Sequence, residues 1–186
     1  LQPRLAEGYF SAVPGPVNAS ADEFEVVMVG SPAHGAYPQL GRDPIVATAS
    51  LITALQHLVS RRSDPMSPSV VTVGSVQAGA SANAIPARAT IRGTLRTFDE
   101  AFRVELHALV EATARGIAAA HGCAADVTIG VGEPVMVNDA HLATRVTSAL
   151  ERFGFSEGAP LRSCGADDFA FYSGVFPALM IFLGVG

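Results

Sequence analysis

The sequence predicts an α+β protein with a ferredoxin-like β-α-β-β-α-β sandwich at its centre. Four segments carry the β-branched or alternating apolar pattern of strands, and two longer segments repeat apolar residues at helical spacing. These six segments follow one another in the order β-α-β-β-α-β. That order is typical of four antiparallel strands with both helices on one face of the sheet.

The first strand, the first helix and the second strand are expected between residues 23 and 76. The segment EFEVVMVG at 23–30 is apolar and β-branched, as in a strand. Asp43 and Pro44 predict a helix start, because an Asp side chain caps free N–H groups and proline suits the first helical position. This helix ends near residue 61, and SVVTVGSV at 69–76 predicts the second strand. The apolar stripe expected on the helix comprises Ile45, Ala49, Ile52, Leu55 and Val59.

The other half of the sandwich is expected between residues 88 and 131. The segment 88–98 alternates cleanly, with Ala89, Ile91, Gly93 and Leu95 on one face and arginines on the other. Residues 99–120 predict an amphipathic helix that ends at Gly122, and 126–131 predicts the fourth strand. On this helix the expected apolar stripe is Phe102, Leu106, Leu109, Val110, Thr113 and Ile117, and Glu111 is expected to pair with Arg115.

The segments that flank the sandwich predict parts of a different domain. Residues 1–20 are rich in proline and glycine and are expected to be extended with a turn. After Pro134 we expect a helix at 140–153, a loop at 155–161, a short helix at 167–173 and a buried strand at 176–183. The predicted sections are therefore 1–20, 21–133 and 134–186. The abrupt start without Met and the apolar end lead us to expect a piece of a larger protein.

Composition excludes several classes of function. The chain is 49% hydrophobic and 16% charged, which suits a packed core, and its net charge of −5 argues against binding to nucleic acid or an anionic membrane. The absence of lysine excludes a Schiff base and a Walker A phosphate loop. Two cysteines are too few for a disulfide scaffold, and no apolar run reaches the length of a membrane span. We expect a cytoplasmic protein.

Two loops present candidate functional side chains. His34 lies among small residues in GSPAHGAYP at 30–38, where another molecule could approach closely, although an exposed loop histidine is an equal alternative. Asn83 lies in GASANAIP at 79–86, and ordinary turn chemistry is its alternative role. The other four histidines lie on or beside predicted helices and are expected to be structural. They are His57, His107, His121 and His141.

Two charged groups are further candidates. Arg88, Arg92 and Arg96 share one strand face, where they repel one another unless an anion or an acidic partner is present, and a solvated sheet face is the alternative. In CGADDF at 164–169, Asp167 and Asp168 could bind a metal or complement a helix dipole, and taken alone the dipole interpretation is favoured.

The order of these segments resembles the M20 family of metal-dependent amidohydrolases and peptidases. The segments GSPAHGAYPQLGRDPI, VTVGSVQAGASANAIPARATIRGTLRTF, PVMVND and GADDFAFYSG carry the resemblance over nearly the whole chain. It is strongest to the N-acyl-amino-acid amidohydrolases, which include hippurate-hydrolase-like and auxin-conjugate-hydrolase-like enzymes. The resemblance implies a lid and dimerisation domain at 21–133 and an incomplete C-terminal part of an α/β catalytic domain at 134–186.

The resemblance also implies roles for individual residues. His34 is similar to the lid histidine that reaches the partner subunit's active site and stabilises the oxyanion. Asn83 and Arg96 are similar to the residues that hold the substrate, and Gly165, Asp167 and Asp168 to a stretch beside the catalytic cleft. Asp167 stands where glutamate is usual, and Gln39 where histidine is common.

The family resemblance implies a divalent metal, zinc or manganese, but its metal ligands match no residue of this chain. We therefore expect no metal on this chain and no activity from it alone. The expected substrate is a small N-acyl amino acid, and the expected partner is a second copy joined through the lid. A non-catalytic dimerisation module is the main alternative. An amino-acid-sensing regulatory domain is a weaker alternative, because the segment after Pro134 resembles part of a catalytic domain.

Overall fold

The computed structural model describes residues 1–186, which form two compact units. We call Asp22–Arg96 with Ala101–Gly132 the sheet unit. We call Leu1–Ala21, Thr97–Glu100 and Glu133–Gly186 the terminal unit. No helix in the protein is both long enough and apolar enough to cross a membrane.

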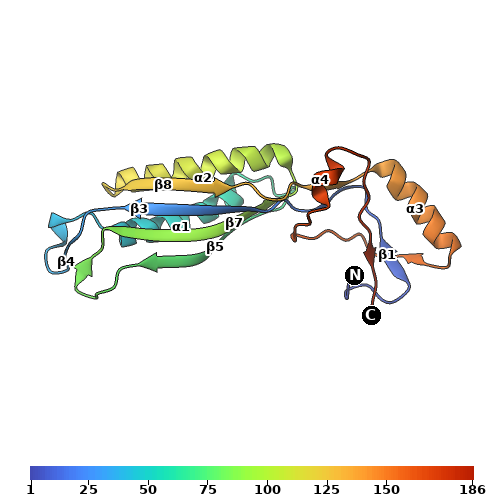
Figure 1. Ribbon diagram of the computed structural model, residues 1–186, viewed down its shortest axis with the longest axis horizontal. Coiled ribbons are helices and arrows are strands. Elements are labelled where there is room, and N and C mark those ends of the chain that lie inside the picture. The colour runs from blue at the N-terminus through green and yellow to red at the C-terminus, as the bar shows by residue number, and fades with distance from the viewer. The chain divides into compact units, whose positions relative to one another are not determined.

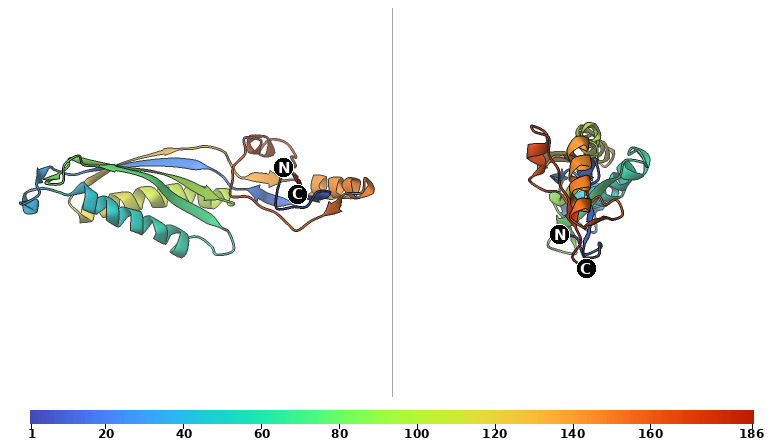
Figure 2. Two further views of the ribbon diagram at one scale, coloured as in Figure 1. Left: turned by 90° about the horizontal axis from the view of Figure 1, so that it is seen from below. Right: turned by 90° about the vertical axis from the view of Figure 1, so that its right-hand side faces the viewer.

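The sheet unit contains a four-stranded sheet with two helices on one of its faces (Figures 1 and 2). The strand order is β5-β7-β3-β8, and β3 pairs antiparallel with both β7 and β8. This is the ferredoxin-like order, so the predicted fold class is confirmed. The elements are β3 (Asp22–Val29), β4 (Ala33–His34), the 3₁₀ helix η1 (Pro38–Leu40), α1 (Pro44–Arg61), β5 (Ser69–Ala78), β6 (Ala84–Ile85), β7 (Arg88–Thr97), α2 (Glu100–Ala120) and β8 (Ala124–Gly130).

Strand alternation places the core of this unit between the sheet and the helices. On β7, Ala89, Ile91 and Leu95 are buried, as the sequence predicts, and Arg88 and Arg92 are exposed. The core combines these residues with the buried face of β3 and with both helices. Its largest fully buried members are Met28, Leu51, Leu55, Ile91, Leu95 and Leu106.

The helix ends agree with the sequence, and the stripe predicted for α1 is partly correct, since Leu55 is buried and Ile52 and Val59 pack against the core. The Asp43 side chain accepts hydrogen bonds from the N–H groups of Ile45 and Val46 and so caps α1. Ile45 and Ala49 are exposed, because α1 is apolar on several faces and its period is ambiguous. The buried residues of α1 are Pro44, Ala47, Thr48, Leu51, Leu55 and Leu58.

The stripe predicted for α2 is correct only in its centre. Leu106 and Val110 are buried, whereas Phe102, Leu109 and Ile117 pack at the margin of the core. Arg103, Ala114 and Ala118 take the remaining buried positions. Gly122 follows α2 with a φ of 66°, and Glu111 pairs with Arg115 at 2.6 Å, both as predicted.

The terminal unit has small sheets and two helices around a compact apolar cluster that includes Val17, Met136, Ala170 and Ala178. Strand β1 lies between β10 and β11, and β2 pairs antiparallel with β9. The elements of this unit are β1 (Tyr9–Ser11), β2 (Gly15–Asn18), β9 (Met136–Asn138), α3 (Ala140–Arg152), β10 (Ser156–Glu157), α4 (Ala170–Ser173) and β11 (Phe182–Leu183).

The buried strand predicted at 176–183 is reduced to β11, and Phe176 is exposed. The physical reason is the side chain of Asn138. Its amide nitrogen donates to the backbone oxygen of Met180, and its amide oxygen accepts from the N–H of Met180. A side chain thus satisfies backbone groups that a strand ladder would otherwise pair. The short helix predicted at 167–173 likewise begins only at Ala170.

Candidate functional site

His34 and Asn83 meet at one end of the sheet unit, which we call the tip and define as residues 31–41 and 79–86. Strands β4 and β6 pair there, with His34 opposite Ala84. The N–H of Gly35 donates to the backbone oxygen of Asn83 at 2.7 Å. The structure therefore brings together two candidates that are 49 positions apart in the sequence.

The local contacts of His34 define which ring nitrogen faces outward. The backbone N–H of Ala36 donates to Nδ1 of His34 at 3.1 Å, so this nitrogen acts as an acceptor. The proton of the neutral imidazole is then on Nε2, which has no partner in the protein. The side chains of both His34 and Asn83 are exposed and make no hydrogen bond other than this one. The tip thus offers an N–H donor and an amide group to another molecule.

The loop that carries His34 is held by short-range contacts. The N–H of Tyr37 donates to the backbone oxygen of His34 at 2.8 Å, and η1 follows at Pro38. Gly35 is needed for the close approach of the two segments, because a Cβ on it would lie 3.0 Å from the backbone carbonyl of Asn83. These contacts fix the imidazole on a rigid turn rather than on a free loop.

Arg96 lies at the opposite end of the sheet unit. Strand β3 leads into the tip at Val29, which pairs with Arg88, whereas Leu95 pairs with Asp22 at the far end of β3. Arg96 follows Arg88 by eight positions, so the two α-carbons are about 26 Å apart along β7. Figure 1 shows β4 and the C-terminal end of β7 at opposite ends of the sheet. The third substrate-binding candidate is therefore not brought to His34 and Asn83 within one chain.

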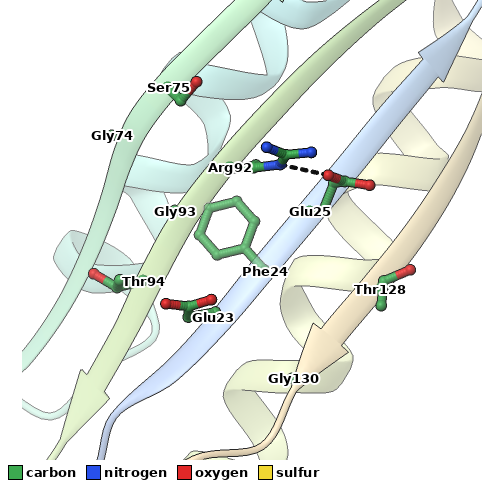
Figure 3. Close-up of a pocket in the computed structure, with 10 residues that line it drawn as sticks. All are labelled: Glu23, Phe24, Glu25, Gly74, Ser75, Arg92, Gly93, Thr94, Thr128 and Gly130. Atoms are coloured by element: carbon green, nitrogen blue, oxygen red, sulfur yellow. Dashed lines mark hydrogen bonds and ion pairs between the residues drawn. The ribbon is translucent and has the colours of Figure 1, made fainter.

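The outer face of the sheet carries the predicted row of arginines and an open depression of about 530 Å³. Nε of Arg92 pairs with a carboxylate oxygen of Glu25 at 2.5 Å, across β7 and β3 (Figure 3). Glu25 is thus the acidic partner that a central arginine of this row requires. This pair favours the sheet-face interpretation for Arg92.

Gly165, Asp167 and Asp168 lie in the terminal unit, before α4. The N–H of Gly165 donates to Oγ of Ser163, and a side-chain oxygen of Asp167 accepts the N–H of Phe169 at 2.9 Å. The contacts of Asp167 are those of a residue at a helix start, in line with the dipole interpretation. No group of three or more His, Cys, Asp and Glu side chains could hold a metal ion, so the residues of this chain do not fit a metal centre.

The sheet unit contains a buried charge cluster that the sequence does not predict. Arg103 donates to both carboxylate oxygens of Asp22, and Nε2 of His107 lies 2.7 Å from one of them. The N–H of Gly132 donates to the same carboxylate at 2.9 Å. Asp22 and Arg103 are 2% and 5% exposed, which is rare for charged residues unless they are paired. Burial alone would raise the pKa of Asp22, but the hydrogen bonds from Arg103, Gly132 and His107 hold this pKa below its ordinary value.

Comparison with known proteins gives close relatives for the whole chain. N-acetyl-L-cysteine deacetylase of Bacillus subtilis is 34% identical over 98% of this chain and 44% of that protein. N-acetyldiaminopimelate deacetylase of Exiguobacterium sibiricum is 34% identical over 100% of this chain and 50% of that protein. The chain therefore spans about half the length of the curated relatives that it matches.

A solved structure and a family match agree with these relatives. The Bacillus subtilis YXEP protein, described as a dinuclear metal-binding peptidase of the M20 family, superposes with a TM-score of 0.82 and 31% identity. This match covers 98% of our chain and 46% of that one. Residues 18–122 match the M20 family described as a peptidase dimerisation domain, which is more than half of the chain. The chain thus belongs to the M20 peptidase family, and its sheet unit corresponds to the dimerisation domain of that family.

Proposed function

We propose that this chain is part of a metal-dependent amidohydrolase that cleaves the amide bond of N-acyl amino acids or similar small amides and peptides. The observation that carries the proposal is the orientation of His34, whose outward Nε2 can donate a hydrogen bond. The names of the relatives support the reaction class, since both deacetylases are named for N-acetylated amino acids.

His34 stabilises the oxyanion that forms when the amide carbonyl is attacked. A neutral imidazole with its proton on Nε2 can donate to this oxygen without first changing its protonation state. Such a donor contributes about a 10²–10³-fold rate increase, because it is strongest where negative charge develops. The contact with Ala36 supports this role, since it keeps the ring from presenting the acceptor nitrogen.

Asn83 and Arg96 orient the rest of the substrate. The amide group of Asn83, on the same tip as His34, offers two donors and one acceptor. Arg96 binds the free carboxylate of the amino acid, for which the forked geometry of a guanidinium is well suited. The position of Arg96 about 26 Å of strand away from the tip supports a site shared between two chains. One copy contributes His34 and Asn83, and the other contributes Arg96.

A homodimer is therefore part of the proposal. Strand β5 is the outermost strand on one side of the sheet and carries no lysine or internal proline that would block pairing. Pairing of β5 with its symmetry copy gives a continuous sheet with twofold symmetry. The family's description as a dimerisation domain supports this arrangement.

Residues 1–20 and 134–186 represent parts of the catalytic domain, and Gly165, Asp167 and Asp168 lie beside its cleft. The implied metal, zinc or manganese, would activate the water that attacks the amide. Because the residues of this chain do not fit a metal centre, we assign no step through the metal to them. Residues 1–186 are accordingly inactive as an isolated chain.

The competing proposal is a non-catalytic dimerisation module, which the family description also favours. The test uses the complete protein that contains this chain, purified with its metal and assayed on a panel of N-acyl amino acids. Hydrolysis that falls about 10²–10³-fold in His34→Ala supports the enzyme, because one oxyanion donor is lost. His141→Ala is the matched control, since His141 is an exposed helix residue. A loss below about tenfold contradicts the role of His34, and a dimer that hydrolyses nothing favours the module.

A further inference from the structure

Tyr37 lies beside His34, and more than half of its side chain is exposed. The two ring centroids are 5.9 Å apart, with an angle of 50° between the planes, which is within the range of aromatic pairs. The Tyr37 side chain is 57% exposed, and its hydroxyl group makes no hydrogen bond. Most of a large aromatic ring therefore remains available for another molecule.

The backbone that carries the ring is held in place. The N–H of Tyr37 donates to the backbone oxygen of His34, and the backbone oxygen of Tyr37 accepts from the N–H of Leu40 at 3.1 Å. Pro38 follows directly and restricts the chain further. An aromatic ring on a held backbone has only two side-chain torsions to restrict when it binds a partner, and this is why such rings dominate contact surfaces.

The residues of the tip itself carry little charge, and the guanidinium of Arg42, next along the chain, is bonded to the backbone oxygen of Gly41 at 2.9 Å. The two segments of the tip, 31–41 and 79–86, contain no Asp, Glu, Lys or Arg, and His34 is their single titratable side chain apart from tyrosine. The carboxylate of an N-acyl amino acid has its proposed partner in Arg96. The acyl group is the uncharged end of such a substrate.

We propose that Tyr37 is a specificity-determining residue that packs against the acyl group of the substrate. This inference rests on the proposed function, because it places the amide oxygen at Nε2 of His34. The acyl substituent is bonded to the same carbon as that oxygen, so it lies beside the imidazole and within reach of the neighbouring ring. The phenol face favours apolar or aromatic acyl groups over a small acetyl group.

The test compares two substrates that share one amino acid, an N-acetyl and an N-benzoyl derivative, in the complete metal-loaded protein. In Tyr37→Ala, kcat/KM for the benzoyl substrate falls about tenfold more than for the acetyl substrate. Tyr37→Phe keeps the ring and stays close to wild type. Changing the amino acid at constant acyl group leaves the effect of Tyr37→Ala unchanged. Leu40→Ala is the matched control, because it removes exposed apolar surface from the same turn.

An equal loss on both acyl groups, or no loss on either, overturns the inference while the proposed function stands. The ¹⁵N NMR signals of the imidazole provide a second readout. They remain those of the Nε2–H form in Tyr37→Ala if the ring contacts substrate, and a change would indicate that Tyr37 only positions His34. A wild-type protein without activity on any N-acyl amino acid overturns the proposed function, and this inference with it.

Discussion

The N–H of Gly35 donates to the backbone oxygen of Asn83 at 2.7 Å, and this contact joins the two segments of the tip. A methyl group on Gly35 would lie 3.0 Å from the carbonyl of Asn83. Gly35→Ala is therefore expected to separate His34 from Asn83 and to lower kcat/KM at least about tenfold, because small misplacements at a reacting centre are costly.

The matched control is Gly116→Ala, since Gly116 lies within α2 and a Cβ there meets nothing. This change is expected to leave kcat/KM unchanged and to raise the free energy of unfolding by about 0.5–1 kcal/mol. Wild-type kinetics in Gly35→Ala would show that the tip does not need this close approach.

Asp22 is expected to be the most sensitive charged residue for stability. Asp22→Asn leaves the buried guanidinium of Arg103 without its anion, so the free energy of unfolding should fall by about 3–5 kcal/mol. Urea titration measures this loss. Asp126→Asn on the exposed side of β8 is the control and should change little.

The same carboxylate predicts a pH dependence. Because the pKa of Asp22 is lowered in the folded protein, its stabilisation is fully present above the ordinary pKa of 3.8. That stabilisation is lost as the pH falls from this value through the lower folded one. The free energy of unfolding of the wild type should therefore decrease below pH 4 more steeply than that of Asp22→Asn. Parallel curves would mean that Asp22 does not titrate differently on folding.

Gly93 on β7 is expected to tolerate no side chain. A Cβ there would overlap the backbone oxygen of Thr72 and lie 2.5 Å from the ring of Phe24, which lies beside Gly93 in Figure 3. Gly93→Ala should lower the free energy of unfolding by about 1–3 kcal/mol through overpacking. Thermal or urea unfolding of Gly74→Ala, on the neighbouring strand and with open space at its Cβ, provides the comparison.

The proposed dimer predicts that a charge on β5 weakens association. Val76 is 54% exposed on this outermost strand, and Val76→Lys brings like charges to the proposed pairing of two β5 strands. Sedimentation velocity should show a shift toward the monomer. Thr128→Lys on β8, the strand at the opposite side of the sheet, should leave the dimer intact. An unchanged dimer in Val76→Lys would place the interface elsewhere.

Local signals account for what the sequence predicted well. The alternation of β7 and the Asp43–Pro44 helix start depend on neighbouring residues alone, and both are observed. The stripe of α1 is predicted only in part, with Leu55 buried but Ile45 and Ala49 exposed, because this helix is apolar on several faces. The strand predicted at 176–183 is shortened for another reason, because the side chain of Asn138 binds the backbone of Met180.

The candidate site likewise has features that local sequence patterns predict and features that they do not. The small residues around His34 and Asn83 identified two loops, and pairing of β4 with β6 joins them. The far position of Arg96 follows from the length of β7, which the sequence also predicted. The cluster of Asp22, Arg103 and His107 spans 85 positions, and no local sequence pattern predicts a contact between residues so far apart.

The central claim, that two copies build one site, is tested most directly by mixing two inactive variants. His34→Ala and Arg96→Ala are co-expressed in the complete protein, and the mixed dimers are assayed for amidohydrolase activity. If His34 and Arg96 act from different copies, each mixed dimer contains one intact site, and the mixture recovers about a quarter of wild-type activity. Activity no higher than the average of the two single variants would contradict the account.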